Sequence, residues 1–148
     1  MICVIQRVSQ ASVTIRNKTR SKINNGLLLF LGVAKTDTSH DTDRLVEKIL
    51  ALRIMEDDAG KMNLSVRETK GEILVVSQFT LCANLKGGRR PDFFPAKEPV
   101  EAERLYNLFI EKLALQNVPV QSGEFGAEMR VNLINDGPVT FILDSVNL

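Results

Sequence analysis

The chain is poor in the side chains that most hydrolases use for covalent or metal chemistry. Its 148 residues include one histidine, two cysteines and no tryptophan. Neither a Ser–His–Asp set nor a cluster of metal ligands can be assembled around one histidine, so the sequence disfavours a small-molecule esterase or amidase. The cysteines, Cys3 and Cys82, are too few for a disulfide scaffold and suit a reducing cytosol.

Charge of one sign and long apolar runs are also missing. The formal net charge is +1, so any contact with nucleic acid must depend on a local patch. The longest apolar run, residues 26–34, is too short to cross a bilayer, and residues 1–10 do not have the pattern of a signal peptide. We therefore expect a cytoplasmic protein with one domain over residues 1–148.

Apolar patterning predicts short strands that come mostly in consecutive pairs. From residue 127 onward the alternation is the clearest in the chain, and a turn at residues 135–138 divides it into two strands of a hairpin. Earlier in the chain, apolar runs and alternation predict strands at residues 1–8, 12–16, 27–33, 73–76 and 118–120, and a hairpin at residues 53–55 and 62–66.

Two amphipathic helices complete the expected fold. The first begins near Thr38, Ser39 and Asp41, which are all plausible N-caps. Its start contains His40, which we expect to be solvated. The second opens at Pro99, where a missing N–H costs nothing. This order of elements indicates an α+β fold in which a curled, largely antiparallel, barrel-like sheet carries two helices on its outside.

Residues 73–81 combine a buried strand with an abrupt polar end. The apolar run ILVV is typical of a strand covered on both faces, and Ser77, Gln78 and Thr80 then follow with Phe79 among them. Polar groups that emerge from a buried strand must find partners, at a cost of about 1–3 kcal/mol each if they do not. The residues form either a strand end bonded to nearby backbone or the floor of a pocket.

Residues 83–95 form a loop, because Gly87, Gly88, Pro91 and Pro95 exclude regular structure. Its basic side chains stand beside two phenylalanines. Charged loops are usually only solvated, but cations next to exposed aromatic rings are also what a phosphate-binding and base-stacking surface needs. The residues concerned are Lys86, Arg89, Arg90, Phe93 and Phe94.

The sequence NDGPVTF (residues 135–141) contains a tight turn in which the Gly137–Pro138 bond can be cis at a cost of about 0.5–1 kcal/mol. Together with SQFTL (residues 77–81), it resembles the signature of the D-aminoacyl-tRNA deacylases. The resemblance extends along the whole chain through MICVIQRVSQASV, LRIMEDDAGKMNLSV, GRRPDF and GEFGAEMR. One departure is Cys82-Ala83-Asn84, where many members have an aromatic residue followed by Ala-Asp.

The resemblance implies a homodimer in which the Gly–Pro turn of one subunit enters the pocket of the other. By similarity the Gly137–Pro138 bond is cis, its carbonyls receive the substrate amino group, and an L side chain is excluded. D-amino acids and glycine are accepted, and the ester to the 3′-terminal adenosine of tRNA is hydrolysed without a metal or cofactor. The substrate-binding residues implied are Met129, Gly137, Pro138, Val139 and Thr140.

The expected catalytic group is Ser77, Gln78, Phe79 and Thr80. A hydroxyl near its normal pKa needs a general base within reach, which counts against Thr80 as a nucleophile. We hypothesise that the vicinal 2′-hydroxyl of the substrate assists hydrolysis, that N–H groups around Phe79 and Thr80 bind the oxyanion, and that Ser77 and Gln78 position the adenosine. In a regular strand these four side chains would alternate in direction, so either the strand bends or they do not share one role.

Lys86, Arg89 and Arg90 are the expected contacts to tRNA phosphates. A non-enzymatic nucleic-acid-binding module is the main alternative, although the near-neutral net charge counts against tight non-specific DNA binding. Release of amino acid from D- versus L-aminoacyl-tRNA separates these two functions.

Overall fold

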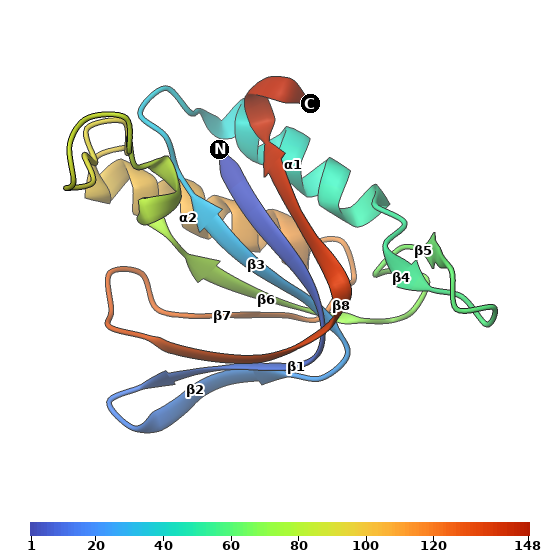
Figure 1. The fold of residues 1–148 in the computed structure, drawn as a ribbon. Helices are drawn as coiled ribbons and strands as arrows, with labels where there is room; N and C mark the ends of the chain where they lie inside the picture. The colour runs from blue at the N-terminus through green and yellow to red at the C-terminus, as the bar shows by residue number, and fades with distance from the viewer.

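The computed structural model describes residues 1–148. Most of its strands form one curled sheet in the order β2-β1-β3-β6-β7, with β8 on β1, while β4 and β5 form a separate hairpin. Figure 1 shows α1 and α2 side by side against one face of the sheet. The elements are β1 (Ile2–Ile15), β2 (Lys18–Ile23), β3 (Gly26–Gly32), α1 (Ser39–Ala51), β4 (Met55–Glu56), β5 (Met62–Leu64), β6 (Glu72–Ser77), η1 (Phe79–Cys82), α2 (Pro99–Ala114), β7 (Val120–Ser122), β8 (Arg130–Asp144) and η2 (Ser145–Asn147).

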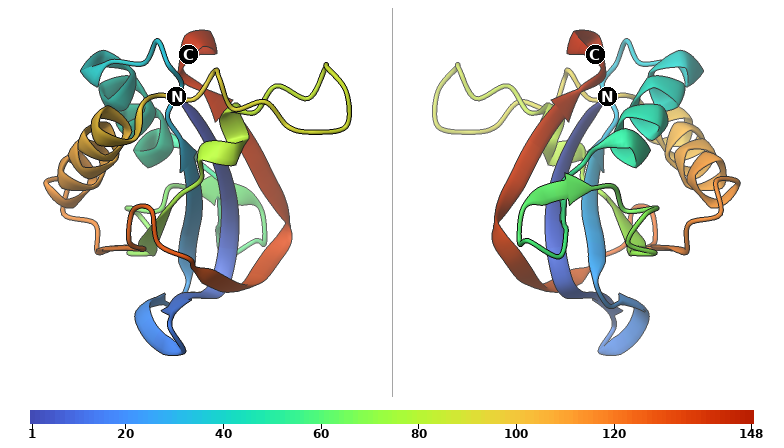
Figure 2. Two further views of the ribbon diagram at one scale, coloured as in Figure 1. Left: turned by 90° about the vertical axis from the view of Figure 1, so that its left-hand side faces the viewer. Right: turned by 90° about the vertical axis from the view of Figure 1, so that its right-hand side faces the viewer.

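Strand β1 organises the sheet because it is long enough to pair with three neighbours. It runs antiparallel to β2, β3 and β8. The pairs β3–β6 and β6–β7 are parallel, so the sheet is antiparallel around β1 and parallel beyond β3. The curl visible in Figures 1 and 2 brings β2, at one end of the strand order, back into contact with β6 and β7 at the other, so the sheet forms a partly closed barrel. The predicted α+β fold, with two helices outside a curled sheet, is confirmed.

Several predicted boundaries are wrong at the two long strands. The two short strands expected at residues 1–8 and 12–16 are one strand, β1, and β2 was not predicted because its sequence KTRSKI is mostly polar. The hairpin expected around residues 135–138 is also wrong. Both halves pair with β1, and the register shifts where Val8 pairs with Asn135 and Gln6 with Thr140. Residues 136–139 therefore bulge from one continuous edge strand.

Strand β6 separates two apolar clusters, which confirms that it is covered on both faces. Ile73 and Val75 belong to the larger cluster, under α1 and α2. Leu74 and Val76 belong to a smaller cluster inside the curl, together with Val13 of β1. Successive side chains of a strand point to opposite faces, so the ILVV run supplies both cores.

The two helices begin as the sequence predicts. The Asp41 carboxylate accepts hydrogen bonds from the N–H of Thr38 at 2.8 Å and from its hydroxyl at 3.0 Å, which fixes the first turn of α1. Pro99 is in the first turn of α2. The longest helix has 16 residues and none of the helices is long and apolar enough to cross a membrane.

The two ends of the chain lie together beside α1 (Figure 1). The Met1 ammonium group is buried and donates to the Asp37 carboxylate at 2.7 Å and to the Ser145 hydroxyl at 2.5 Å. The Ser145 hydroxyl donates in turn to Asp41 at 2.8 Å. A buried charge needs a partner of this kind, so the network fastens β1, η2 and α1 to one another.

Candidate functional site

The polar end of β6 is a sharp bend. The last bond of the β3–β6 ladder runs from the Gln78 N–H to the Leu31 carbonyl at 2.8 Å, and the chain then turns into η1 at Phe79. Gly32 permits this turn to approach β3, since a Cβ atom there would lie 3.0 Å from the Gln78 carbonyl oxygen. A regular strand would point the side chains of residues 77–80 in alternating directions. The strand bends here instead.

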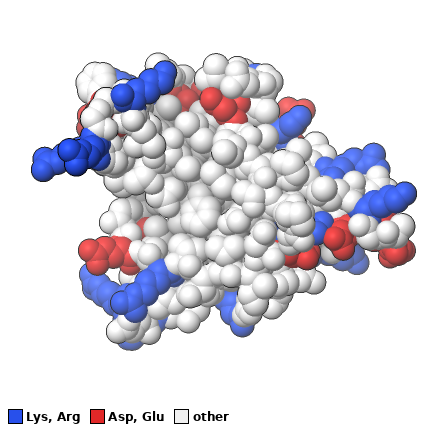
Figure 3. Space-filling view, in the orientation of Figure 1, with Lys and Arg blue, Asp and Glu red and all other residues white.

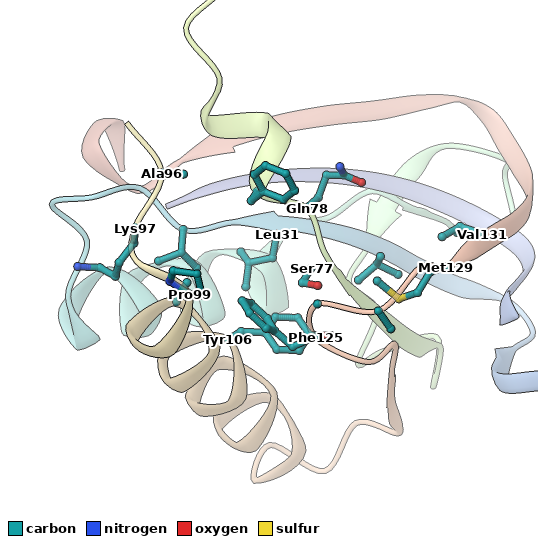
Figure 4. Close-up of a pocket in the computed structure, with 16 residues that line it drawn as sticks. Leu31, Ser77, Gln78, Ala96, Lys97, Pro99, Tyr106, Phe125, Met129 and Val131 are labelled. Carbon is teal, nitrogen blue, oxygen red and sulfur yellow. The ribbon is translucent and has the colours of Figure 1, made fainter. Parts of the chain in front are cut away.

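A cavity of about 490 Å³ opens at this bend. Figure 4 shows Ser77 and Gln78 at its wall, with Tyr106 and Phe125 opposite. The volume falls in the usual range for a small-molecule site. Its sides come from the end of β6, the start of α2 and the segment before β8, and its lining residues include Ser77, Gln78, Phe79, Ala96, Lys97, Pro99, Tyr106, Phe125, Met129 and Val131.

The cavity contains no group suited to act as a general base. Lys97 is its one ionisable side chain apart from Tyr106, and the Lys97 ammonium donates to the Lys35 carbonyl at 2.9 Å. The Tyr106 hydroxyl donates to the Val75 carbonyl at 3.0 Å, and burial raises the pKa of Tyr106 above its usual range. Tyr106 is also part of the core.

Thr80 is not among the residues that line the cavity. Its side chain is exposed, and its hydroxyl oxygen accepts a hydrogen bond from the Gln78 amide. The single histidine, His40, is exposed in α1 on another part of the fold. The geometry therefore provides no histidine to activate Thr80, and it places Ser77, Gln78 and Phe79 at the cavity but Thr80 just outside it.

The bulge in β8 is held by a buried arginine. The Arg7 side chain is 4% exposed, and its Nε lies 3.0 Å from the Asp136 carbonyl oxygen and 2.9 Å from the Asp136 carboxylate. Its other nitrogens donate to the Ile54 carbonyl at 3.1 Å and to the Glu56 carboxylate at 2.7 Å. A guanidinium offers donors in a rigid fork, so Arg7 fixes the backbone immediately before Gly137 relative to β1 and β4.

Asn135 holds the same bulge from its other side. Its amide nitrogen donates to the Arg7 carbonyl at 2.9 Å and to the Val139 carbonyl at 3.1 Å. The Gly137–Pro138 bond is cis, and a Cβ atom on Gly137 would lie 2.4 Å from the Asn135 side-chain oxygen. Any other residue at position 137 would therefore displace this side chain.

The expected substrate-binding residues fall into two groups. Met129 lines the cavity, whereas Gly137, Pro138, Val139 and Thr140 do not. Val139 is buried in the core, and the Thr140 hydroxyl accepts from the Gln6 amide at 3.1 Å. Within one chain, Met129 therefore lines the same cavity as residues 77–79, whereas the Gly–Pro bulge does not line it.

Sequence reasoning missed Arg7 and Phe125. The available signal for Arg7 was a charged residue inside the otherwise apolar alternation of MICVIQRV, which a buried ion pair explains. Phe125 lies in a glycine-flanked loop, and its ring centroid is 5.8 Å from that of Tyr106. Its place in the wall depends on a contact with α2 that no local pattern indicates.

Residues 83–95, hereafter the basic arm, project from the body of the fold (Figure 2). The arm is closed at its base by Asn84 and Asp92, whose backbones exchange bonds of 2.7 and 3.1 Å. Lys86, Arg89 and Arg90 lie beyond this closure and form no ion pair. The three predicted tRNA-contacting residues therefore share one projection and lie outside the cavity.

No group of three or more histidine, cysteine, aspartate or glutamate side chains is arranged to hold a metal ion. Burial raises the pKa of the Cys3 thiol to about 12, and desolvation also raises the pKa of Cys82. Neither cysteine is therefore a thiolate near neutral pH, which is what a metal ligand or nucleophile requires.

A sequence profile of the D-Tyr-tRNA(Tyr) deacylase family matches residues 4–144. The D-aminoacyl-tRNA deacylase of Geobacter sulfurreducens is 54% identical over 145 residues, which are 98% of this chain and 95% of that protein. The D-aminoacyl-tRNA deacylase of Thermosipho melanesiensis is 52% identical over 146 residues, 98% of this chain and 97% of that protein.

Two solved structures share the fold. One, described as a c-Myc DNA Unwinding Element Binding Protein, has a TM-score of 0.92 and 43% identity, and covers 97% of this chain and 98% of that one. The other, described as a probable eukaryotic D-amino acid tRNA deacylase, has a TM-score of 0.82 and 18% identity, and covers 96% of this chain and 97% of that one. At that identity the second likeness concerns the fold alone.

Proposed function

This chain belongs to the D-Tyr-tRNA(Tyr) deacylase family, and from that membership we propose that it hydrolyses the ester bond of D-aminoacyl-tRNA to give a free D-amino acid and tRNA. It is a hydrolase of the D-aminoacyl-tRNA deacylase type. We extend the proposal to glycyl-tRNA and place the reaction in the cytoplasm, where it would remove mischarged amino acids before translation.

The observation that carries the proposal is the cavity at the end of β6. Its wall is mostly apolar, and Ser77 and Gln78 are polar groups at the end of β6, whereas the polar ends of Lys97 and Tyr106 are bonded to backbone carbonyls. Such a site suits an amino-acid side chain and a nucleoside held by a few directed hydrogen bonds. The cavity has no carboxylate or histidine that could act as a general base. An aminoacyl ester needs such a base less than an amide does, because the ester is already activated.

The proposed mechanism uses the substrate's own ribose. The vicinal 2′-hydroxyl would orient or activate the attacking water, and the backbone N–H groups of Phe79 and Thr80 would stabilise the oxyanion. These residues open η1, and the first N–H groups of a helix have no partner within it. Ser77 and Gln78 would position the adenosine from the cavity wall.

A homodimer would complete the site. The outer edge of β8 is unpaired, and its exposed apolar side chains include Ile134, Phe141 and Ile142. Figure 3 shows that the middle of the face seen in Figure 1 carries few charged side chains. An exposed apolar edge strand tends to pair with another chain, so this face is our candidate for the contact between two copies.

In this dimer the Gly–Pro bulge of one subunit would enter the cavity of the other. Gly137 and Pro138 would present main-chain carbonyls to the substrate amino group, with Val139, Thr140 and Met129 beside them. The clamp made by Arg7 and Asn135 supports this role, because selection by handedness requires a wall that does not yield to an L side chain. Lys86, Arg89 and Arg90 would contact tRNA phosphates from the basic arm.

A non-enzymatic nucleic-acid-binding module is the second candidate. It is favoured by the likeness to the structure described as a c-Myc DNA Unwinding Element Binding Protein. The two candidates differ in one product, since a binding module releases no amino acid.

The test compares release of amino acid from D- and L-aminoacyl-tRNA by the purified protein. We expect release from the D-ester only, and slower release when the 2′-hydroxyl of the terminal adenosine is replaced by hydrogen while binding persists. Absence of D-specific release would contradict the proposed function. An unchanged rate with the 2′-deoxy substrate would contradict only the substrate-assisted mechanism.

A further inference from the structure

Two phenylalanine rings outside the core stand at the edge of the cavity. Phe79 is 57% exposed and Phe93 is 39% exposed. Their ring centroids are 4.9 Å apart with an interplanar angle of 61°, a normal edge-to-face geometry for an aromatic pair. The core does not account for them, because neither ring belongs to an apolar cluster.

This pair joins the cavity to the basic arm. Phe79 is one of the residues that line the cavity, whereas Phe93 comes from the arm. The Phe93 carbonyl accepts from the Ala96 N–H at 2.9 Å, and Ala96, labelled in Figure 4, is again part of the cavity wall. The two rings therefore lie between the cavity and the part of the arm that carries Lys86, Arg89 and Arg90.

The electrostatic setting favours a polyanion. Lys86, Arg89 and Arg90 have no carboxylate within ion-pair distance. Asp92 is the one acidic residue in the arm, and its carboxylate accepts from the Phe94 N–H at 3.0 Å. Unpaired cations beside exposed aromatic rings are the combination with which proteins bind single-stranded nucleic acid.

We propose that Phe79 and Phe93 form a stacking platform for the nucleotide next to the terminal adenosine, in the single-stranded 3′ end of tRNA. This inference rests on the proposed function, since it takes the terminal adenosine to be bound at Ser77 and Gln78. Stacking on an aromatic ring does not read the identity of the base, so one platform serves every tRNA species that carries a D-amino acid.

Phe94 provides a matched control within the same arm. It is adjacent in sequence and 73% exposed, but it is not among the cavity-lining residues. The Lys35 ammonium lies 3.7 Å from its ring centroid and covers one face of the ring. Loss of Phe94 therefore removes an exposed aromatic ring of the same size without touching the platform.

The experiment is a double-mutant cycle between protein and tRNA, measured as kcat/KM for release of the D-amino acid. Phe93→Ala is combined with a tRNA that has an abasic site next to the terminal adenosine. We expect each change alone to lower kcat/KM by about five- to 100-fold, and the two together to lower it little further, because both remove one contact. Phe93→Trp should retain the wild-type value, and Phe94→Ala should change it less than about threefold.

Three results would overturn the platform. Additive losses in the cycle, or an equal loss from Phe94→Ala, would each show that Phe93 does not act through that base. Dissociation of a dimer by Phe93→Ala in sedimentation would show that the ring belongs to a contact between copies. Failure of the proposed function is distinguishable, because the wild-type protein would then release no D-amino acid from unmodified tRNA.

Discussion

The two irregular segments expected to meet the substrate, the β8 bulge and the basic arm, are held in opposite ways. The bulge is fixed by a buried guanidinium and by the Asn135 amide, which bond its backbone on both sides of Gly137. The arm is tied at its base by the Asn84–Asp92 pair, and its cations have no partner. A segment that must reject a mirror-image side chain needs a fixed backbone, whereas one that meets a polyanion needs reach and charge.

Removing the clamp should have the largest effect. Arg7→Ala leaves the carbonyls of Asp136 and Ile54 without their donors, and we expect it to lower the free energy of unfolding by about 2–6 kcal/mol, which is about 1–3 kcal/mol for each unsatisfied carbonyl. Urea unfolding measures this change. Arg104→Ala is the matched control, because Arg104 forms an exposed pair with Glu101 and should cost less than about 0.5 kcal/mol. Equal effects of the two substitutions would show that Arg7 is no clamp.

Separating the proposed dimer should come next. Ile142 is 72% exposed on β8, so Ile142→Lys should leave the fold intact but place a charge in the apolar contact. We expect sedimentation to show a monomer and D-aminoacyl-tRNA hydrolysis to fall by at least about 100-fold, roughly 2.7 kcal/mol of barrier, because the cavity then lacks the partner's bulge. An active monomer would contradict the shared site.

Neutralising the arm should have a smaller effect that depends on salt. Replacing Lys86, Arg89 and Arg90 with glutamine should weaken tRNA binding and reduce its salt slope by about one unit per lost contact. The unfolding free energy should change by less than about 0.5 kcal/mol, since these side chains make no contact that stabilises the fold. An unaltered slope in a salt titration would remove the arm from the tRNA contact.

The smallest effect is expected at Thr80, where η1 leads from the cavity into the arm. Thr80→Ala removes an exposed hydroxyl bonded to Gln78 and should retain most of the deacylase rate. Single-turnover release of the D-amino acid measures this. A loss above about 10³-fold, roughly 4 kcal/mol of barrier, would instead indicate a covalent nucleophile.

Local chemistry predicted much of the fold. The ILVV run predicts a strand buried on both faces, which the structure confirms. The first helix begins at the predicted cap, where Thr38 bonds to Asp41, and the second begins at Pro99 as predicted. Asn-Asp-Gly-Pro was misinterpreted as a hairpin because a bulge and a turn use the same residues. What distinguishes them is the pairing of both flanks with β1, a long-range choice that local sequence does not contain.

The candidate site was likewise predictable where it depends on local sequence and not where it depends on long-range contacts. The sequence led to Ser77, Gln78 and Phe79 because polar residues ending a buried strand require an explanation, and these residues do line the cavity. Arg7 was missed because its role depends on Asp136, Ile54 and Glu56, which lie far from it in the chain. Alternation alone places residue 7 in a strand but does not say which carbonyls surround it.

Strand β8 pairs with β1 on both sides of its bulge. The number of residues in the bulge is therefore as important as their identity. Strand residues on either side are paired with β1 in a fixed register, from Arg130 to Asn135 and from Thr140 to Asp144. An insertion or deletion of one residue at positions 136–139 would shift one flank by one place, and such a slip turns every side chain of that flank to the opposite face. Phe141 and Leu143 would then exchange environments with Thr140 and Ile142, so loop grafting here should be more damaging than any single replacement on the outer surface of the strand.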